Sequence, residues 1–133
     1  NTQVLKFQPE DLLPYTMSLA DISLVTLDKG MEGLMVPSKV FFYMSAGSSI
    51  LGICEGKNDL EYIINNERCG RIASPGKIDE IVQNILFMVE DKIKLNNMKI
   101  NSRTAAVNKY SKEACISLLK QNIIKSGIYN NNG

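Results

Sequence analysis

Short apolar runs alternate along the chain with segments in which apolar residues recur every three or four positions. This alternation predicts an α/β fold, an open parallel sheet with helices on both faces. The runs ISLVTL and SILGIC are almost continuously apolar, as in strands buried on both faces. The predicted strands cover residues 3–7, 22–27, 49–54 and 70–73.

Helical periodicity fills the remaining segments. From residue 78 to 89, apolar side chains fall at i, i+3, i+4, i+7, i+8 and i+11, a stripe expected to pack on the domain. Gly47 and Gly70 follow two predicted helices, where a left-handed cap favours glycine. A break is expected at Tyr110 and Ser111. The predicted helices cover residues 11–20, 38–46, 58–67, 77–89 and 92–125.

Length and composition indicate a single globular unit. The chain has 133 residues, of which 44% are hydrophobic, enough to build one core. Residues 1–125 are assigned to a partial Rossmann-like domain, and residues 126–133, which are polar and prone to turns, to a disordered tail. Because the chain opens with Asn1 and enters an apolar run within three residues, we expect a piece truncated at its N-terminal side.

Charge and cysteine content exclude several classes of function. Fifteen Lys and Arg balance fourteen Asp and Glu, so a large basic surface for nucleic acid is not expected. The three cysteines are widely spaced and the chain has no histidine, which favours reduced, mostly buried thiols over a metal site. No apolar run is long enough to cross a bilayer, and we expect a cytoplasmic protein.

The residues that could bind a ligand follow the ends of predicted strands. In an open parallel sheet, ligands bind beyond the carboxyl ends of the strands. There, Gly30 and Gly33 let the backbone turn toward a ligand, and Ser38 and Lys39 open a helix whose free N–H groups favour an anion such as a diphosphate. The alternative is ordinary capping by a Pro-Ser pair, with a lysine that is merely solvated.

Acidic residues supply a second set of candidates. Glu32 lies beside a glycine and could accept hydrogen bonds from sugar hydroxyls, or be a solvated loop acid. Glu55 ends the third apolar run and is expected to project over the same crevice, whereas Asp59 is better explained as a helix cap. The aromatic and apolar side chains at 41–44 and 62–64 are assigned to the core.

The order and spacing of several short stretches resemble a known family. LADISLV leads into EGLMVPSK, YMSAG precedes a strand, and CG and PG flank a shorter one. Together they resemble the C-terminal, donor-binding half of GT-B-fold glycosyltransferases of family 4, and most closely the bacterial branch that builds capsule, O-antigen and related surface polysaccharides. The likeness runs from about residue 4 to about residue 119.

The resemblance implies a function and a set of site residues. It implies retaining transfer of a hexosyl or N-acetylhexosaminyl group from a nucleotide-diphosphate sugar to a glycan or lipid-linked acceptor, with no bound metal. The parent enzyme could then lie peripherally at the inner membrane through its missing part. The implied catalytic residues are Glu32 and Lys39, and the implied donor-binding residues are Gly30, Gly33, Leu34, Ser38, Lys39 and Glu55.

The chain departs from the family pattern in two ways. The family often carries a second glutamate eight residues after the first, but that position is Val40, or Phe42 when YMSAG is aligned. The ribose contact is therefore in doubt, and Glu55 is a stand-in. The acceptor-binding N-terminal half is also missing, so this chain alone is not expected to catalyse transfer.

Other functions remain open from the sequence. A nucleotide-sugar epimerase of the same fold would share these features. A non-catalytic doubly wound binding or assembly module is a further alternative, for which the lost second glutamate is the only hint. A receiver-type signalling module ranks lower, because no acidic pair follows a first strand.

Overall fold

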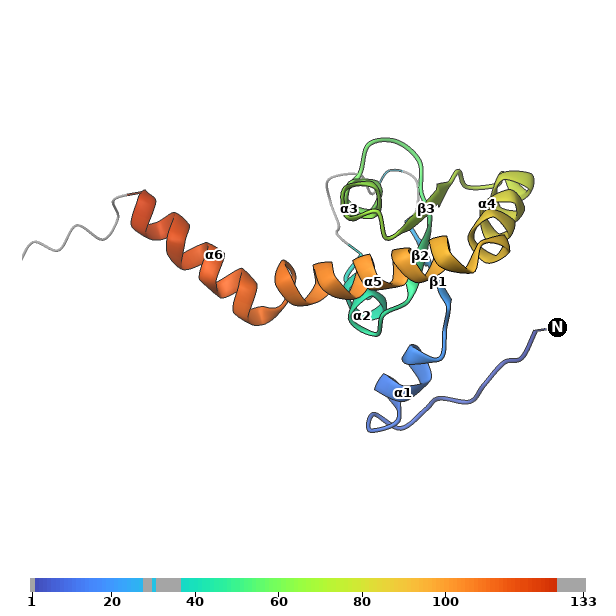
Figure 1. Cartoon of the computed structure of the whole chain (residues 1–133), viewed down its shortest axis with the longest axis horizontal. Helices are drawn as coiled ribbons and strands as arrows, with labels where there is room; N and C mark the ends of the chain where they lie inside the picture. Colours follow the sequence, from blue (N-terminus) through green and yellow to red (C-terminus); the bar gives the residue numbers. More distant parts are fainter. Residues whose placement is uncertain (1, 28–29, 31–36, 127–133) are drawn as a thin grey trace, which may run out of the picture.

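A computed structural model describes residues 2–27, 30 and 37–126 of the chain. Its strands form one parallel sheet in the order β1, β2, β3 (Figure 1). In the register of this sheet, Leu24 lies opposite Leu51, which lies opposite Arg71. The α/β class and the open parallel sheet are thus confirmed, as are three of the four predicted strands. The strands are β1 (Ile22–Thr26), β2 (Ser49–Ile53) and β3 (Gly70–Ala73).

Helices cover both faces of the sheet. α2 (Lys39–Ser45) and α3 (Asp59–Glu67) connect the strands, and α3 packs on the face that carries Gly52, where a Cβ atom would meet Ile64. α4 (Ile78–Glu90) covers the opposite face, where Arg71 Nε donates to Asn84 Oδ1 at 3.0 Å. Side chains alternate between faces along a strand, so Arg71 points toward α4 and its neighbour Ile72 points toward the face that α3 covers.

α5 (Lys92–Asn108) runs along the amino ends of the strands. Lys99 forms a 2.7 Å ion pair with Asp21, which immediately precedes β1. Arg103 donates to the carbonyl of Ser45, and the Asn101 amide donates to the carbonyl of Arg68 at 3.2 Å. α5 therefore fastens the segments that lead into each of the three strands.

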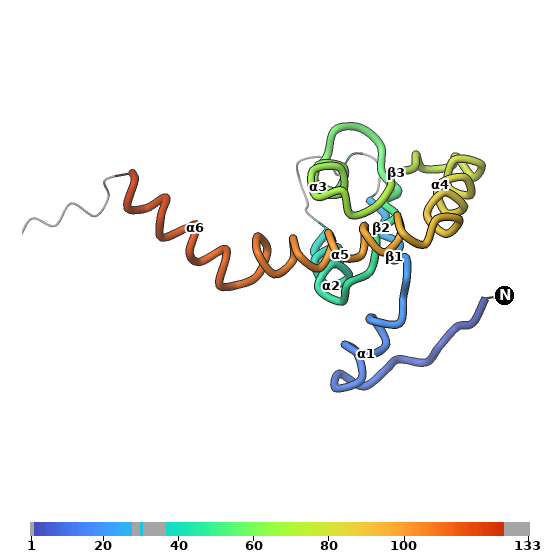
Figure 2. Tube along the Cα trace, in the orientation of Figure 1, coloured from blue at the N-terminus to red at the C-terminus, as the bar shows by residue number. Residues whose placement is uncertain are grey.

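The C-terminal helix begins at the predicted break. Ser111 caps α6 (Lys112–Lys125) by accepting from the Ala114 N–H at 3.2 Å. α6 buries no side chain and extends away from the sheet (Figure 2). The tail predicted at 126–133 lies outside the described residues from 127 onward. Within the described ranges, no helix combines the length and the apolar character that crossing a bilayer requires.

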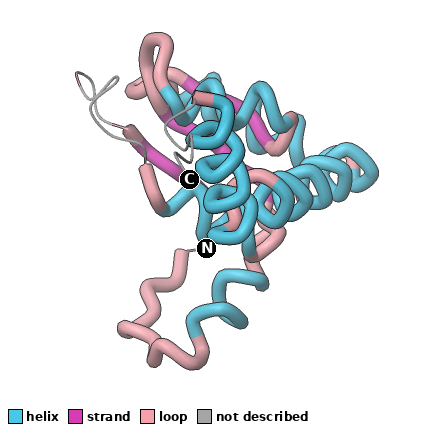
Figure 3. The backbone as a smooth tube through the Cα atoms, turned by 90° about the vertical axis from the view of Figure 1, so that its left-hand side faces the viewer, coloured by secondary structure: helices cyan, strands magenta, loops and turns pink. Residues whose placement is uncertain are grey.

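The strand predicted at residues 3–7 is wrong. This segment carries no strand, and Val4 and Phe7 are 94% and 95% exposed. It leads to α1 (Leu13–Ser18), which is shorter than predicted and lies with it at the margin of the molecule (Figure 3). An apolar run becomes a strand only beside a partner edge, and no described strand pairs with this one.

Two predictions about burial need correction. β2 is covered on both faces, but β1 is not, because Leu24 is 52% exposed. α4 packs on the domain through Asn84 and Met88 rather than through the predicted stripe, whose outer members Ile78 and Val82 are 72% and 47% exposed. On this packed side, Asn84 Oδ1 accepts from Arg71 Nε and its Nδ2 donates to the carbonyl of Ile72, whereas Ile81 of the stripe is only part-buried.

The core holds only some of the side chains assigned to it. Met44, Ile63 and Ile64 are buried, and Phe41 and Tyr43 pack partly against them. In contrast, Phe42 is 57% exposed and Tyr62 is 65% exposed. Both belong to helices whose opposite side faces the sheet, so helical spacing places them outward.

The two predicted glycine caps have different outcomes. Gly47 has φ +78°, as a left-handed cap requires, but the left-handed residue after α3 is Arg68, with φ 52°. Gly70 instead opens β3 against the backbone of β2. A Cβ atom at Gly70 would lie 1.7 Å from the carbonyl oxygen of Ile50, so the strands approach more closely than any side chain allows.

Glu67 joins the ends of α3 and α5. Its side chain, 7% exposed, accepts from Lys109 Nζ at 2.7 Å and from the Tyr110 hydroxyl at 3.1 Å. The Tyr110 ring in turn packs on Phe41, with ring centroids 5.0 Å apart. Burial alone would raise the pKa of Glu67, but the hydrogen bonds from Lys109, Asn66 and Tyr110 outweigh it and lower the pKa.

Replacing Gly70 with alanine should unfold the sheet edge. The Gly70→Ala chain is expected to lose about 3 kcal/mol or more in free energy of unfolding, because the new methyl group meets backbone that cannot move aside. Gly52→Ala is the control, since its Cβ would meet the ends of the Ile64, Ile72 and Leu60 side chains and not backbone. Urea unfolding monitored by circular dichroism measures both, and an equal loss would contradict the close approach.

The Glu67 contacts should make stability depend on pH in a defined direction. Because the folded-state pKa lies below the ordinary 4.5, the stabilisation is present above the unfolded-state pKa and is lost as pH falls through the folded value. Glu67→Gln is expected to lower the free energy of unfolding by about 1–2 kcal/mol at pH 7, with the difference shrinking in acid. Glu90→Gln, on the exposed side of α4, is the control, and a pH-independent difference would count against this ion pair.

Candidate functional site

The carboxyl ends of β1 and β2 lie side by side and bring the predicted site segments to one edge of the sheet. The backbone hydrogen bonds between the strands continue past the ends of β1 and β2. Leu27 N–H donates to the Ile53 carbonyl at 2.9 Å, and Cys54 N–H donates to the Ala73 carbonyl at 3.1 Å. Gly30 follows β1 with φ +86°, as a glycine turn requires. The predicted residues Glu32, Gly33 and Leu34 lie outside the described residues.

Ser38 and Lys39 begin α2 with their side chains exposed. The Ser38 hydroxyl does not cap the helix, and the Lys39 ammonium has no hydrogen bond or ion pair among the described residues. The expected row of free N–H groups is shortened, since Val40 N–H donates to the Pro37 carbonyl and Phe41 N–H to the Ser38 carbonyl. An anion here would be held chiefly by the two side chains.

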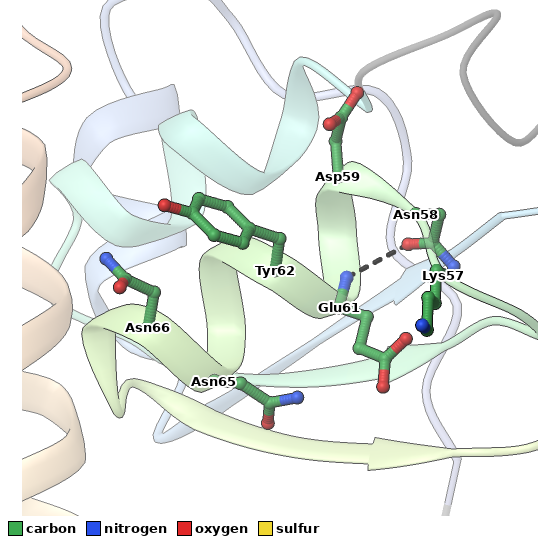
Figure 4. Close-up of a pocket in the computed structure, with 7 residues that line it drawn as sticks. All are labelled: Lys57, Asn58, Asp59, Glu61, Tyr62, Asn65 and Asn66. Atoms are coloured by element: carbon green, nitrogen blue, oxygen red, sulfur yellow. Dashed lines mark hydrogen bonds between the residues drawn. The ribbon is translucent and has the colours of Figure 1, made fainter.

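Asn58 organises the loop that follows β2. Its Nδ2 donates to the carbonyls of Gly56 and Glu55, at 3.1 and 3.4 Å. Its Oδ1 accepts from the Glu61 N–H at 2.9 Å, the dashed line in Figure 4. The helix cap is therefore Asn58, and the assignment of Asp59 as the cap is wrong.

Cys54 lies directly beneath this loop and is 4% exposed. Burial raises the pKa of its thiol, an effect that a hydrogen bond with Asn58 opposes and the nearby Glu61 carboxylate reinforces. The thiol is therefore a packing group at the base of the site and not a nucleophile. Glu55, the next residue, is exposed where the crevice was predicted.

An open hollow of about 690 Å³ extends from this loop along the outer side of α3. Its volume is within the usual range for small-molecule sites. The hollow carries both signs of charge, and Tyr62, assigned to the core from sequence, presents its ring there (Figure 4). The lining residues are Lys57, Asn58, Asp59, Glu61, Tyr62, Asn65 and Asn66.

The described residues provide no ready metal centre. No group of three or more Cys, Asp or Glu side chains among them could hold an ion. The edge instead offers a lysine, a hydroxyl and a carboxylate on neighbouring loops, a set that can hydrogen-bond phosphate and hydroxyl groups. These are the predicted Lys39, Ser38 and Glu55.

Comparison with known proteins identifies a related enzyme. The chain is 36% identical over 76 residues to the probable glycosyltransferase WbjE of Pseudomonas aeruginosa. Part of this chain is therefore related to a probable glycosyltransferase. The matched part is 52% of the chain but only 19% of that relative's length. No family model matches the chain, and no solved structure does.

The three thiols should differ in reactivity according to their burial. Cys54 and Cys69 are buried, and burial raises the pKa of Cys69 to about 12, whereas Cys115 on α6 is exposed. Ellman's reagent at pH 7.5 is expected to titrate one thiol per folded chain and three in denaturant. Cys115→Ser should leave none in the folded chain. Fast reaction of Cys54 would show that the base of the site is open.

Proposed function

We propose that the chain is the donor-binding part of a retaining glycosyltransferase with a GT-B fold, similar to family 4. The observation that carries the proposal is the 36% identity to a probable glycosyltransferase. The open parallel sheet supports it, because such sheets bind nucleotides beyond their carboxyl ends. The matched part spans only 19% of the relative's length, so the transfer of a sugar by the parent enzyme is also proposed here.

The proposed ligand is a nucleotide-diphosphate sugar. Lys39 would bind the diphosphate, and its lack of a partner among the described residues leaves the ammonium available. The hydroxyl of Ser38 would donate a hydrogen bond to the same group. As the sugar departs, negative charge builds up on the diphosphate, and a fixed cation there stabilises the transition state. This is charge that a bound metal supplies in other enzymes.

Other predicted residues would contact the donor near the Lys39 ammonium. Gly30 would allow the loop after β1 to approach the donor, and Glu55 would accept hydrogen bonds from ribose hydroxyls. Glu32, Gly33 and Leu34 would have the roles that the family resemblance implies, Glu32 as a catalytic residue and the other two as donor-binding residues. The acceptor, a glycan or a lipid-linked glycan, would meet the donor at this same edge.

Titration of the isotope-labelled chain with UDP and with GDP, followed by NMR, tests donor binding. We expect shifts confined to residues 30–40 and 54–58. Lys39→Ala should weaken binding by roughly 10-fold to 100-fold, the value of one hydrogen bond to a charged group. The affinity should be unchanged by a metal chelator.

Lys120→Ala, on the exposed side of α6, is the matched control for the loss of a positive charge. It should bind as the unmodified chain does. Shifts that spread over the whole surface, or that persist at full strength in Lys39→Ala, would contradict the proposed diphosphate site. Failure to bind either nucleotide would contradict the donor-binding role.

A further inference from the structure

We infer that Asn58 is a positioning residue, which holds the loop after β2 in the conformation that presents Glu55 to a nucleotide sugar. The inference rests on the proposed function for the identity of the ligand. It rests on the geometry of Asn58 for the mechanism, and that geometry can be tested without any ligand.

Asn58 uses both ends of its amide. The oxygen accepts from the Glu61 N–H at 2.9 Å and so caps α3. The nitrogen donates to the carbonyls of Gly56 and Glu55 at 3.1 and 3.4 Å. With 8% of its surface exposed, the side chain forms these bonds largely out of water, where they are stronger than on an open surface.

The two bonds to carbonyls determine which way the loop faces. A trans peptide holds its N–H opposite to its C=O, and no cis peptide occurs among the described residues. Because the carbonyls of Glu55 and Gly56 turn inward to Asn58, the N–H groups of Gly56 and Lys57 turn outward. Gly56 has φ +77°, which allows this tight reversal.

Glu55 is held from both sides as a result. On one side, Cys54 N–H belongs to the ladder with β3, through its 3.1 Å bond to the Ala73 carbonyl. On the other, the carbonyl of Glu55 itself is bound by Asn58. The direction in which the Glu55 side chain leaves the backbone is thereby restricted, which is what orienting a carboxylate toward ribose hydroxyls requires.

Capping alone does not explain why an asparagine stands here. Serine caps helices about as well as asparagine, because a cap needs only one acceptor oxygen. The serine hydroxyl is too short to reach the two carbonyls as well. Asn58→Ser therefore keeps the cap and removes the loop bonds, whereas Asn58→Ala removes both.

The first experiment measures loop order in the absence of ligand. NMR order parameters of the Gly56 and Lys57 amides should fall from about 0.85, typical of rigid backbone, to below about 0.6 in both variants. The midpoint of thermal unfolding should fall clearly only in Asn58→Ala. If loop order follows stability, so that the serine variant keeps a rigid loop, Asn58 is only a cap and the inference is wrong.

The second experiment measures recognition of the ribose. The probes are the nucleoside diphosphate that the unmodified chain binds, UDP or GDP, and its 2′,3′-dideoxy analogue. The unmodified chain should prefer the hydroxylated form by roughly tenfold, as for a hydrogen bond to a carboxylate. Asn58→Ser, Asn58→Ala and Glu55→Gln should all bring this ratio close to one.

The outcomes separate this inference from the proposed function. If the unmodified chain binds neither diphosphate, the proposed function fails, and the loop-order experiment still decides whether Asn58 positions the loop. If the unmodified chain shows no preference for the hydroxylated form, or Asn58→Ser keeps the preference, Asn58 does not position Glu55 and the inference is overturned.

Discussion

The middle strand β2 is the element on which the rest of the structure depends. It pairs with a strand on each edge, and helices cover both its faces, so Ile50 and Leu51 are fully buried although they point in opposite directions. Gly70 also lies tightly against this strand, because a Cβ atom added there would lie 1.7 Å from the carbonyl oxygen of Ile50. Burial of apolar side chains on both faces is what allows three short strands to form a stable sheet.

The dependence on β2 explains which parts of the fold could be predicted from the sequence. A short apolar run is a local property, and such runs correctly placed β1, β2 and β3 but also predicted a strand at residues 3–7 that does not form. Whether both faces of a strand are covered depends on distant segments, and Leu24 of β1 is half exposed although its run is as apolar as that of β2. In α4, likewise, the packed side carries Asn84, which bonds to β3, and the periodicity of apolar residues does not predict such a contact.

In the candidate site, too, some features could be predicted from the sequence and others could not. Its position at the carboxyl ends of the strands, the turn at Gly30 and the exposure of Ser38, Lys39 and Glu55 could be predicted, since each follows from strand order and residue type. Asn58 was missed, although an Asn followed three residues later by a Glu is a recognisable start of a helix. Its bonds to Glu55 and Gly56 have no sequence signal, because they depend on the left-handed conformation of Gly56.

The long-range contacts of α5 and the candidate site lie at opposite ends of the sheet. At the amino ends, α5 fastens the chain through long-range contacts such as Lys99 with Asp21 and Lys109 with Glu67. At the carboxyl ends, Asn58 bonds to the loop after β2 over a span of only a few residues. A substitution in this loop that keeps the α3 cap, such as Asn58→Ser, is therefore expected to change the loop without loosening the contacts of α5. If this edge binds a nucleotide sugar as proposed, its ligand preference should be sought in loop residues and not in the core, because loops carry binding residues on a rigid scaffold.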